Sequence, residues 1–212
     1  RDIARKQRDQ ISEQKQAIMD SIYYARRIQS ALLPPDEYME KLLPEFFVLN
    51  KPRDVVSGDY YWMTEKNGKI VITAADCTGH GVPGAFMSML GVALLNEIVN
   101  KEDAVHANQI LNNLKSNVIK SLHQTGKENE AKDGMDMALS VIDMTAKKIE
   151  FSGAYNPLYL IRNGELTQFK ADRMPIGIYS TEKGAFTNNI IDFKAGDCIY
   201  MFSDGYCDQF GG

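Results

Sequence analysis

The sequence contains few cysteines, and their spacing does not indicate any pairing. Its 212 residues include three, Cys77, Cys198 and Cys207, with no C-x-x-C pair among them. An odd number of isolated cysteines is unlike the framework of a disulfide-stabilised secreted protein. We therefore expect the protein to work in a reducing compartment, the cytoplasm.

Basic charge and long apolar runs are also missing. The formal net charge is −4, so no overall positive field would draw the chain to nucleic acid or to an anionic membrane. No apolar run approaches the roughly 18 residues of a membrane span, and no signal peptide is recognisable. Both ends of the sequence look cut, so tethering to a membrane sensor outside it stays open.

Several catalytic templates are absent as well. There is no G-x-x-x-x-G-K-[ST] phosphate-binding loop and no G-x-S-x-G nucleophile elbow. The histidines are scattered at His80, His106 and His123, and no Cys/His spacing matches a zinc site. These absences argue against P-loop nucleotide hydrolysis, serine-hydrolase chemistry and zinc binding.

Residues 1–33 form a compositional block without Gly or Pro. An apolar row recurs in it every seven residues, at Ala4, Ile11, Ile18, Ala25 and Leu32. The second row of such a heptad pattern is mostly polar, with Gln7, Gln14, Ser21 and Ile28. The pattern favours either a weak parallel coiled coil, hence a homodimer, or a linker helix docked to an upstream sensor domain. The alternative is a solvated helix. Because Pro34-Pro35 would end the helix, residues 1–35 are predicted to be a regulatory segment.

Strand and helix patterns define a predicted domain over residues 46–212. Two strands are expected at 55–63 and 69–75, joined by an Asn-Gly turn. Two helices should follow, one at 82–100 that is apolar on most sides and one at about 104–122. Further strands are expected at 135–142, 148–153, 158–162, 166–170, 190–193 and 198–202. This order indicates an α+β fold of antiparallel sheets with helices packed outside.

Three apolar strand-like segments each carry an aspartate within three residues of a glycine. They are VVSGDYY with Asp59, VITAADCTGHG with Asp76, and IYMFSDGY with Asp204. A single aspartate of this kind is usually a turn or a cap. Three carboxylates brought together would repel one another, and a divalent cation with oxygen ligands, Mg²⁺ or Mn²⁺, removes that repulsion. The segments therefore suggest a hard-metal hydrolase.

Taken in order, these motifs resemble a known family. The segments SGDYYW, ADCTGHGVPGAFMSMLG, GAYNPLYLIRNGEL, PIGI and YMFSDGY are similar to those of the metal-dependent PPM (phosphatase 2C-like) protein serine/threonine phosphatases. The match is to the bacterial branch of the stage II sporulation phosphatase and covers residues 46–212. The resemblance implies an α-β-β-α sandwich of two antiparallel sheets flanked by helices, here preceded by a long N-terminal helix.

The resemblance also implies a set of site residues. Asp59 and Asp76 would bind two Mn²⁺ or Mg²⁺ ions, with Asp76 bridging both, and Asp204 would hold one of them. Cys77 would contribute only its backbone carbonyl. A water bridging the ions would hydrolyse phosphoserine or phosphothreonine. Family members carry a further Asp-Asp motif after the S-D-G segment, and this sequence ends before it. We therefore expect a truncated catalytic domain, a fragment that lacks one metal ligand and full activity.

Four other residues are weaker candidates. His80 would assist proton transfer, or it would only order the Gly-His-Gly turn. Arg53 would contact a phosphate, although an exposed ion pair is the more ordinary role of such a residue. One of Asp133 and Asp136 would contact a third, loosely held metal, and a solvated turn is the better-supported alternative for both.

The expected function is dephosphorylation of a bacterial signalling protein, of the anti-sigma antagonist type, under control of the N-terminal helix. Two other readings stay open. One is a non-catalytic pseudophosphatase that serves as an interaction module. The other is an unrelated metal-dependent phosphoesterase acting on nucleotides or sugar phosphates.

Overall fold

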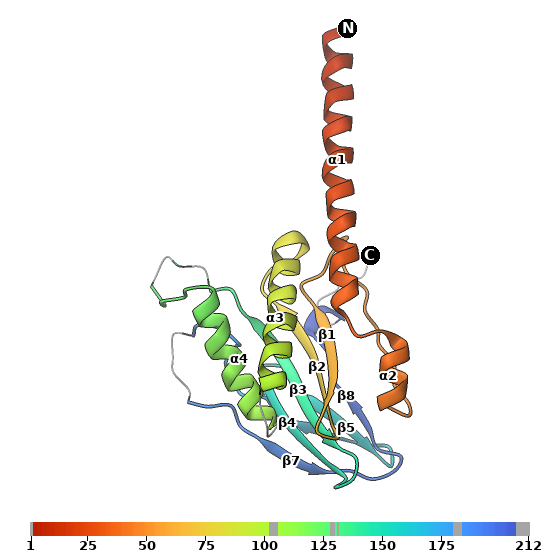
Figure 1. Cartoon of the computed structure of the whole chain (residues 1–212), viewed down its shortest axis with the longest axis vertical. Coiled ribbons are helices and arrows are strands. Elements are labelled where there is room, and N and C mark those ends of the chain that lie inside the picture. The colour runs from red at the N-terminus through yellow and green to blue at the C-terminus, as the bar shows by residue number, and fades with distance from the viewer. Residues whose placement is uncertain (1, 102–105, 128–129, 131, 180–183, 207–212) are drawn as a thin grey trace.

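The computed structural model describes residues 2–101, 106–127, 130, 132–179 and 184–206. A long helix stands away from a body made of two β-sheets and further helices (Figure 1). Of the predicted domain, residues 207–212 lie outside the described residues, and so do positions 104 and 105 of the predicted second helix.

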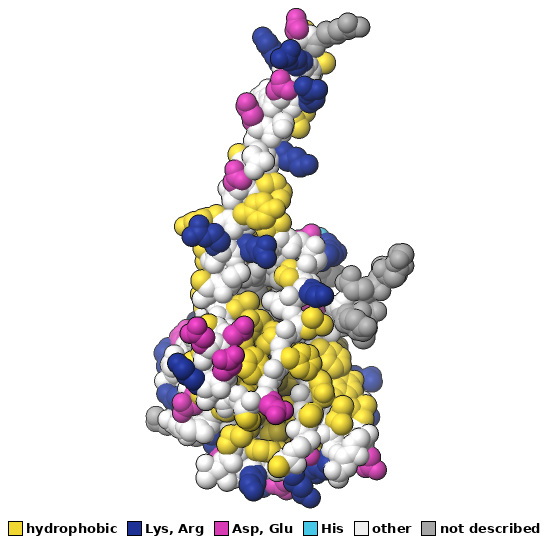
Figure 2. Space-filling model, turned by 90° about the vertical axis from the view of Figure 1, so that its right-hand side faces the viewer, with side chains coloured by type: hydrophobic (Ala, Val, Ile, Leu, Met, Phe, Trp, Pro, Cys, Tyr) yellow, Lys and Arg dark blue, Asp and Glu magenta, His cyan; other side chains and the backbone are white. Residues whose placement is uncertain are grey.

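The N-terminal helix α1 runs from Asp2 to Leu32, in agreement with the sequence pattern. Its only buried residue is Gln29, near the C-terminal end. The apolar row is exposed to solvent, with Ile11 at 64% and Ile18 at 61%. Along the protruding part, hydrophobic side chains are interspersed with charged ones (Figure 2). The helix therefore attaches to the body at one end and leaves its heptad row uncovered.

A short helix, α2 (Asp36–Leu42), follows and was not predicted. Its N-cap residue is Pro35, which has an extended backbone, and the side chain of Met39 is buried. Seven residues are too few to show a helical period, and the preceding Pro-Pro pair pointed to a loop.

Sheet A holds five antiparallel strands in the order β1-β2-β3-β4-β7. The strands are β1 (Tyr60–Lys66), β2 (Lys69–Cys77), β3 (Met135–Asp143), β4 (Lys148–Ala154) and β7 (Asn189–Asp192). Asn67 and Gly68 both have positive φ angles, 54° and 75°, as the predicted turn between β1 and β2 requires. The first strand was predicted to begin at Val55, but it begins five residues later.

Sheet B is smaller, with three antiparallel strands in the order β6-β5-β8. The strands are β5 (Leu158–Arg162), β6 (Glu165–Phe169) and β8 (Cys198–Tyr200). The turn between β5 and β6 is the predicted Asn163-Gly164 pair, with φ angles of 52° and 81°. All eight strands in the described part of the chain lie within or next to the ranges that the sequence indicated.

Two helices, α3 (Gly81–Lys101) and α4 (Ala107–Ser121), pack on sheet A. One apolar core joins residues of these helices with residues of sheet A, including Leu95, Leu111 and Met137. A second joins residues of both sheets, including Phe151 and Leu158. The fold is therefore α+β, with two antiparallel sheets and flanking helices, as predicted.

Helix α3 departs from two expectations. It is long and apolar enough to span a membrane by length and composition alone. However, 56% of its most apolar window is buried, and core helices of soluble proteins often meet the same criterion. It is also less enclosed than predicted, since Phe86, in its second turn, is 67% exposed.

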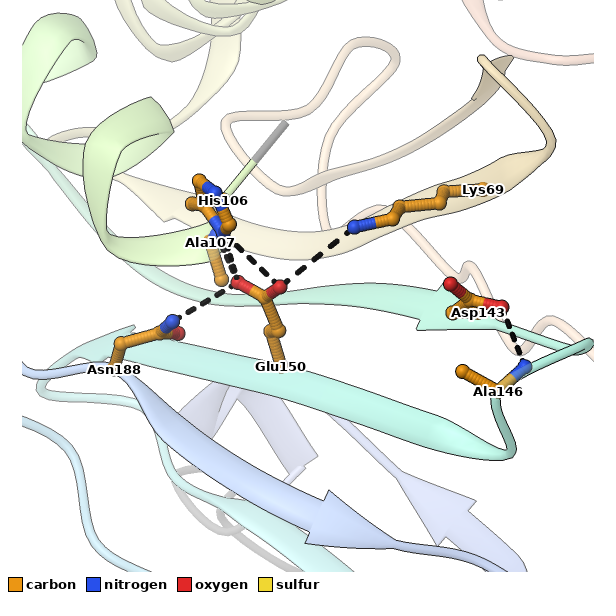
Figure 3. Close-up of polar contacts among 7 residues, drawn as sticks. All are labelled: Lys69, His106, Ala107, Asp143, Ala146, Glu150 and Asn188. Atoms are coloured by element: carbon orange, nitrogen blue, oxygen red, sulfur yellow. Dashed lines mark hydrogen bonds and ion pairs between the residues drawn. The ribbon is translucent and has the colours of Figure 1, made fainter. Parts of the chain in front are cut away.

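A cluster of polar side chains around Glu150 of β4 connects the start of α4 to the neighbouring strands of sheet A (Figure 3). The Glu150 carboxylate is 3.0 Å from Nδ1 of His106, accepts a bond of 2.9 Å from Nδ2 of Asn188, and lies 3.9 Å from Nζ of Lys69. It also accepts a 3.4 Å bond from the backbone N–H of Ala107, the first residue of α4. One carboxylate thus caps the helix and joins it to β2, β4 and the segment before β7.

Candidate metal centre at one end of sheet A

Two predicted aspartates lie at the same end of the β1–β2 hairpin. Asp59 immediately precedes β1, and Asp76 is the penultimate residue of β2. Tyr60 pairs with Ala75, so the two aspartates are placed side by side across the hairpin. Asp59 therefore lies just before a strand, where the sequence pattern had placed it inside one, but the predicted proximity is confirmed.

Asp204 comes to the same place from the other end of the described chain. It starts a 3₁₀ turn, Asp204–Tyr206, shortly after β8. The preceding Ser203 donates a 2.7 Å hydrogen bond from Oγ to Oδ2 of Asp59. The backbone of Gly205 is also close to Asp59, because a Cβ atom added at Gly205 would lie 3.3 Å from Oδ2 of Asp59. The S-D-G segment is therefore in direct contact with the Asp59 carboxylate, across 144 residues of sequence.

Asp76 shows how closely the three carboxyl groups approach. Burial raises its pKa from 3.8 to about 8, together with hydrogen bonding to Asp204 and the charge of Asp59. Every contribution acts in the same direction, so no basic side chain in the described part of the chain offsets the negative charge. This is the signature of carboxylates that share a site.

Asp136 joins the cluster from β3. It is the register partner of Asp76 and is half-buried; burial and the charge of Asp204 raise its pKa to about 6. The solvated-turn interpretation of Asp136 is therefore wrong. Register decides this, since β2 and β3 are joined through two helices and a loop. Asp133 lies in the loop before β3, where its backbone carbonyl accepts a hydrogen bond from Gln124, and its side chain forms no ion pair with any described residue.

Three glycines hold the Asp59 loop against the start of α3. A side chain added at Gly58 would lie 2.7 Å from the carbonyl oxygen of Gly79, and one added at Gly84 would lie 2.6 Å from the same oxygen. Both distances are far below van der Waals contact, and the neighbours are backbone atoms that cannot rotate away. The spacing of these glycines therefore fixes where Asp59 lies relative to the loop that follows Asp76.

Cys77 has the environment of a core residue. Its side chain is 4% exposed within the core between sheet A and the helices. Burial, then the charge of Asp76, raises the pKa of its thiol well above the ordinary value. A protonated, buried thiol is a poor metal ligand, which agrees with the expectation that only the backbone carbonyl would serve.

His80 and Arg53 lie together beside the carboxylates. Nδ1 of His80 is 2.6 Å from a guanidinium nitrogen of Arg53 and 2.9 Å from Oδ2 of Asp54. All three side chains are exposed, with the His80 ring at 68%. Asp54 was not singled out by the sequence, because an Arg-Asp pair in a loop reads as an ordinary surface ion pair.

Tyr155 is a further neighbour that the sequence did not indicate. It follows β4 next to Ala154, the register partner of Met137, and so lies beside Asp136. Its φ of 58° is in the left-handed region, which is unusual for a large side chain and is found at functional sites. Hydrogen bonding to Tyr179, burial and nearby charge that includes Asp136 raise its pKa to about 12.

The donor set fits a hard divalent cation. Asp59, Asp76, Asp136 and Asp204 offer only oxygen atoms, and the raised pKa of Asp76 reports a negative charge that a cation would offset. Within the described ranges, no three His, Cys, Asp or Glu side chains form a complete metal-binding cluster. The pKa of Asp76 is nonetheless raised by hydrogen bonding and charge from both Asp204 and Asp59.

Solved structures share this architecture. The SiaA-PP2C domain of Pseudomonas aeruginosa superposes with a TM-score of 0.81 at 32% identity, covering 93% of this chain and 76% of that one. The PP2C phosphatase domain with a regulatory-domain fragment of SpoIIE from Bacillus subtilis gives a TM-score of 0.56 at 25% identity, over 71% of this chain and 41% of that one. The fold and its acidic sheet edge thus define a PP2C-type phosphatase domain.

Sequence comparisons give the family. The family model of stage II sporulation protein E (SpoIIE) matches residues 66–211, which is most of the chain, and the chain belongs to this family. It is also 25% identical over 195 residues to the phosphoserine phosphatase RsbU of Bacillus subtilis (strain 168). That alignment covers 90% of this chain and 54% of RsbU, so the chain spans about half the length of this curated relative.

Proposed function

We propose that this protein is a metal-dependent protein serine/threonine phosphatase that acts in the cytoplasm. The observation that supports this most directly is the convergence of Asp59, Asp204 and Asp136 on Asp76 at one end of sheet A. Four acidic groups without a compensating basic group are costly in any protein that does not use them to bind cations. Membership of the SpoIIE family agrees with the proposal.

Asp59, Asp76 and Asp204 would hold two Mn²⁺ or Mg²⁺ ions, with the backbone carbonyl of Cys77 as an additional oxygen donor. When bound, the ions would activate a water molecule and neutralise the phosphoryl group. Asp136, the register partner of Asp76, would contact a further ion or its hydration shell. Ser203 keeps Asp59 in position through its 2.7 Å hydrogen bond.

The proposed substrate is a phosphoserine or phosphothreonine residue of a bacterial signalling protein, of the anti-sigma antagonist type. Similarity to RsbU, a phosphoserine phosphatase, supports the amino-acid class. The site is open to a folded protein substrate, since His80 and Arg53 beside it are exposed.

We also propose that α1 controls the site through Gln29. The buried Gln29 amide donates hydrogen bonds to the carbonyl of Ser57 (2.6 Å) and to Oγ of Ser88 (2.8 Å). Its oxygen accepts a 3.1 Å bond from the backbone N–H of Ser57. Ser57 is two residues before Asp59, so a shift of α1 would move the loop that places this ligand.

The exposed heptad row of α1 would bind an upstream sensor domain or a second copy of the helix. The row is mostly apolar and, in the described residues, is uncovered except near its C-terminal end. A parallel pairing would be weak because the second row is mostly polar. Analytical ultracentrifugation of the chain and of an Ile11→Asp/Ile18→Asp variant tests pairing, and equal molecular mass for both would contradict it.

The experiment that tests the activity is Mn²⁺-dependent hydrolysis of p-nitrophenyl phosphate and of a phosphoserine peptide. Asp76→Asn should abolish it, whereas Asp143→Asn should not. Asp143 lies at the far end of β3, where its carboxylate accepts a hydrogen bond from the N–H of Ala146 in the same turn (Figure 3). Retained activity in Asp76→Asn would rule out the assigned centre.

The same assay separates the alternative of a non-catalytic interaction module. The presence of all three aspartates Asp59, Asp76 and Asp204 in the sequence disfavours that alternative. A module of this kind would bind Mn²⁺ weakly or not at all in calorimetry and would hydrolyse neither substrate. Hydrolysis of nucleotides or sugar phosphates in preference to the peptide would indicate a different phosphoesterase.

A further inference from the structure

One ring nitrogen of His80 faces an anion and a cation at the same time. Nδ1 is 2.9 Å from Oδ2 of Asp54 and 2.6 Å from Nη2 of Arg53, and Arg53 is itself 3.6 Å from Asp54. The other ring nitrogen, Nε2, makes no hydrogen bond with any described residue. The ring is thus anchored through one nitrogen and presents the other to solvent.

The two contacts of Nδ1 have opposite chemical consequences. A bond from Arg53 requires an unprotonated Nδ1, whereas a bond to Asp54 requires an N–H there. An N–H directed at a carboxylate also stabilises the imidazolium, which carries a second proton on Nε2. Asp54 therefore favours the form of His80 that can donate a proton, and Arg53 opposes it.

Asp54 also contacts the start of helix α3. A side chain added at Gly81, the first residue of α3, would lie 3.6 Å from Oδ2 of Asp54, so the carboxylate lies against the N-terminus of this helix. The positive end of a helix dipole stabilises an anion. The loop of residues 77–81 in turn packs on Gly58, so this pair lies directly beside the Asp59 loop.

We infer that Asp54 is a positioning residue that holds His80 as the proton donor to the leaving group. The inference rests on the proposed phosphatase function and adds a role that the carboxylate cluster does not supply. A serine side chain leaves phosphorus as an alkoxide, a strong base that needs a proton as it departs.

The proposed step balances as follows. A water oxygen forms the new bond to phosphorus and releases one proton to solvent. The bond between phosphorus and the seryl oxygen breaks, and its electron pair stays on that oxygen. The Nε2 proton of His80 moves to the seryl oxygen, which gives serine and inorganic phosphate, and His80 then regains a proton from solvent. Asp54 keeps its charge throughout and pairs with Nδ1–H.

The test compares two leaving groups in one set of variants. Nitrophenolate is a weak base and departs without a proton, whereas the seryl oxygen needs one. Asp54→Ala should therefore lower kcat for a phosphoserine peptide by about 10- to 100-fold and change kcat for p-nitrophenyl phosphate less than about threefold. Asp54→Glu should restore much of the peptide rate, and Asp143→Asn should leave both rates unchanged.

Two further measurements exclude a merely structural effect. The His80→Gln variant should show the same dependence on leaving group, and combining it with Asp54→Ala should cause no further loss, because both remove one function. Calorimetric Mn²⁺ affinity should be unchanged in Asp54→Ala. Equal loss on both substrates, or no loss on the peptide, would overturn the role of Asp54. If the unsubstituted protein hydrolyses neither substrate, the proposed function itself fails and the role falls with it.

Discussion

Replacing Asp76 with Asn is expected to stabilise the metal-free protein near pH 8 while it abolishes activity. Burial, the hydrogen bond to Asp204 and the charge of Asp59 raise the pKa of Asp76 from 3.8 to about 8. In the unfolded chain the group returns to its ordinary pKa, so the unfolded chain releases a proton that the folded protein retains. The stability that this proton provides is fully present below pH 3.8 and is lost as the pH rises to about 8.

The magnitude follows from this difference in pKa. For a fully buried group, the step from 3.8 to about 8 would correspond to roughly 5–6 kcal/mol, at about 1.4 kcal/mol for each pH unit. Asp76 is only half-buried, so solvent screening reduces the expected effect to about 1–3 kcal/mol. The pKa of Asp136 rises to about 6, so its own contribution is already lost at higher pH. The interval between about pH 6.5 and 8 therefore reports mainly on Asp76.

The assay is urea-induced unfolding in excess chelator at both ends of this interval. The free energy of unfolding of the unsubstituted protein should fall by about 1 kcal/mol between them, and that of Asp76→Asn should fall by less than half as much. Asp143→Asn should follow the unsubstituted protein. Equal pH dependence in the unsubstituted protein and Asp76→Asn would refute the argument that the carboxylates converge on Asp76.

Three other substitutions test the packing next to the site and the anchoring of helix α4. Gly84→Ala places a Cβ atom 2.6 Å from the backbone oxygen of Gly79. Stability should drop by about 1–3 kcal/mol, partly offset by the better helix propensity of alanine, and Mn²⁺ affinity should fall. Urea unfolding measures the first effect and calorimetry the second. Gln29→Leu leaves backbone groups of the loop without partners, which should cost about 1–3 kcal/mol and weaken Mn²⁺ binding in the same titration; unchanged binding would contradict the coupling of α1 to the site. Burial alone would raise the pKa of Glu150, but hydrogen bonds from Asn188 and His106 lower it below 4.5. The contribution of Glu150 to stability is therefore present above pH 4.5 and is lost as the pH falls below it. In thermal unfolding, Glu150→Gln should destabilise the protein at pH 7 and much less at pH 4.

The part of the site that the sequence predicted lies in one hairpin and one short motif. Asp59 and Asp76 flank an Asn-Gly turn at nearly equal distances, so a regular hairpin must bring them together. Asp204 was found because its S-D-G segment repeats the same pattern of an apolar strand followed by aspartate and glycine. Local sequence patterns therefore predicted that these aspartates come together, and the resemblance to a family assigned their roles as metal ligands.

The remainder depends on register and loop packing, which the sequence does not encode locally. Asp136 is opposite Asp76 only because β3 returns beside β2 after two helices and a long loop, and a register shift of one residue would turn it to the other face. The Asp54–His80 contact joins two loops whose approach is set by glycines rather than by any charge pattern. Gln29 lies in a polar stretch of α1, and nothing in its spacing distinguishes it from the exposed glutamines before it.

The attachment of α1 near one end gives the helix the geometry of a lever. From Gln29 to Asp2 the helix extends about 40 Å, at about 1.5 Å for each residue. If it pivots at its attachment, a displacement of roughly 8 Å at the free end turns the helix by only about 11° and moves atoms about 5 Å from the pivot by about 1 Å. That smaller distance is comparable to the difference between a good hydrogen bond and a broken one. The long arm thus reduces large movements at its tip to the scale on which the Ser57 contacts are made or lost.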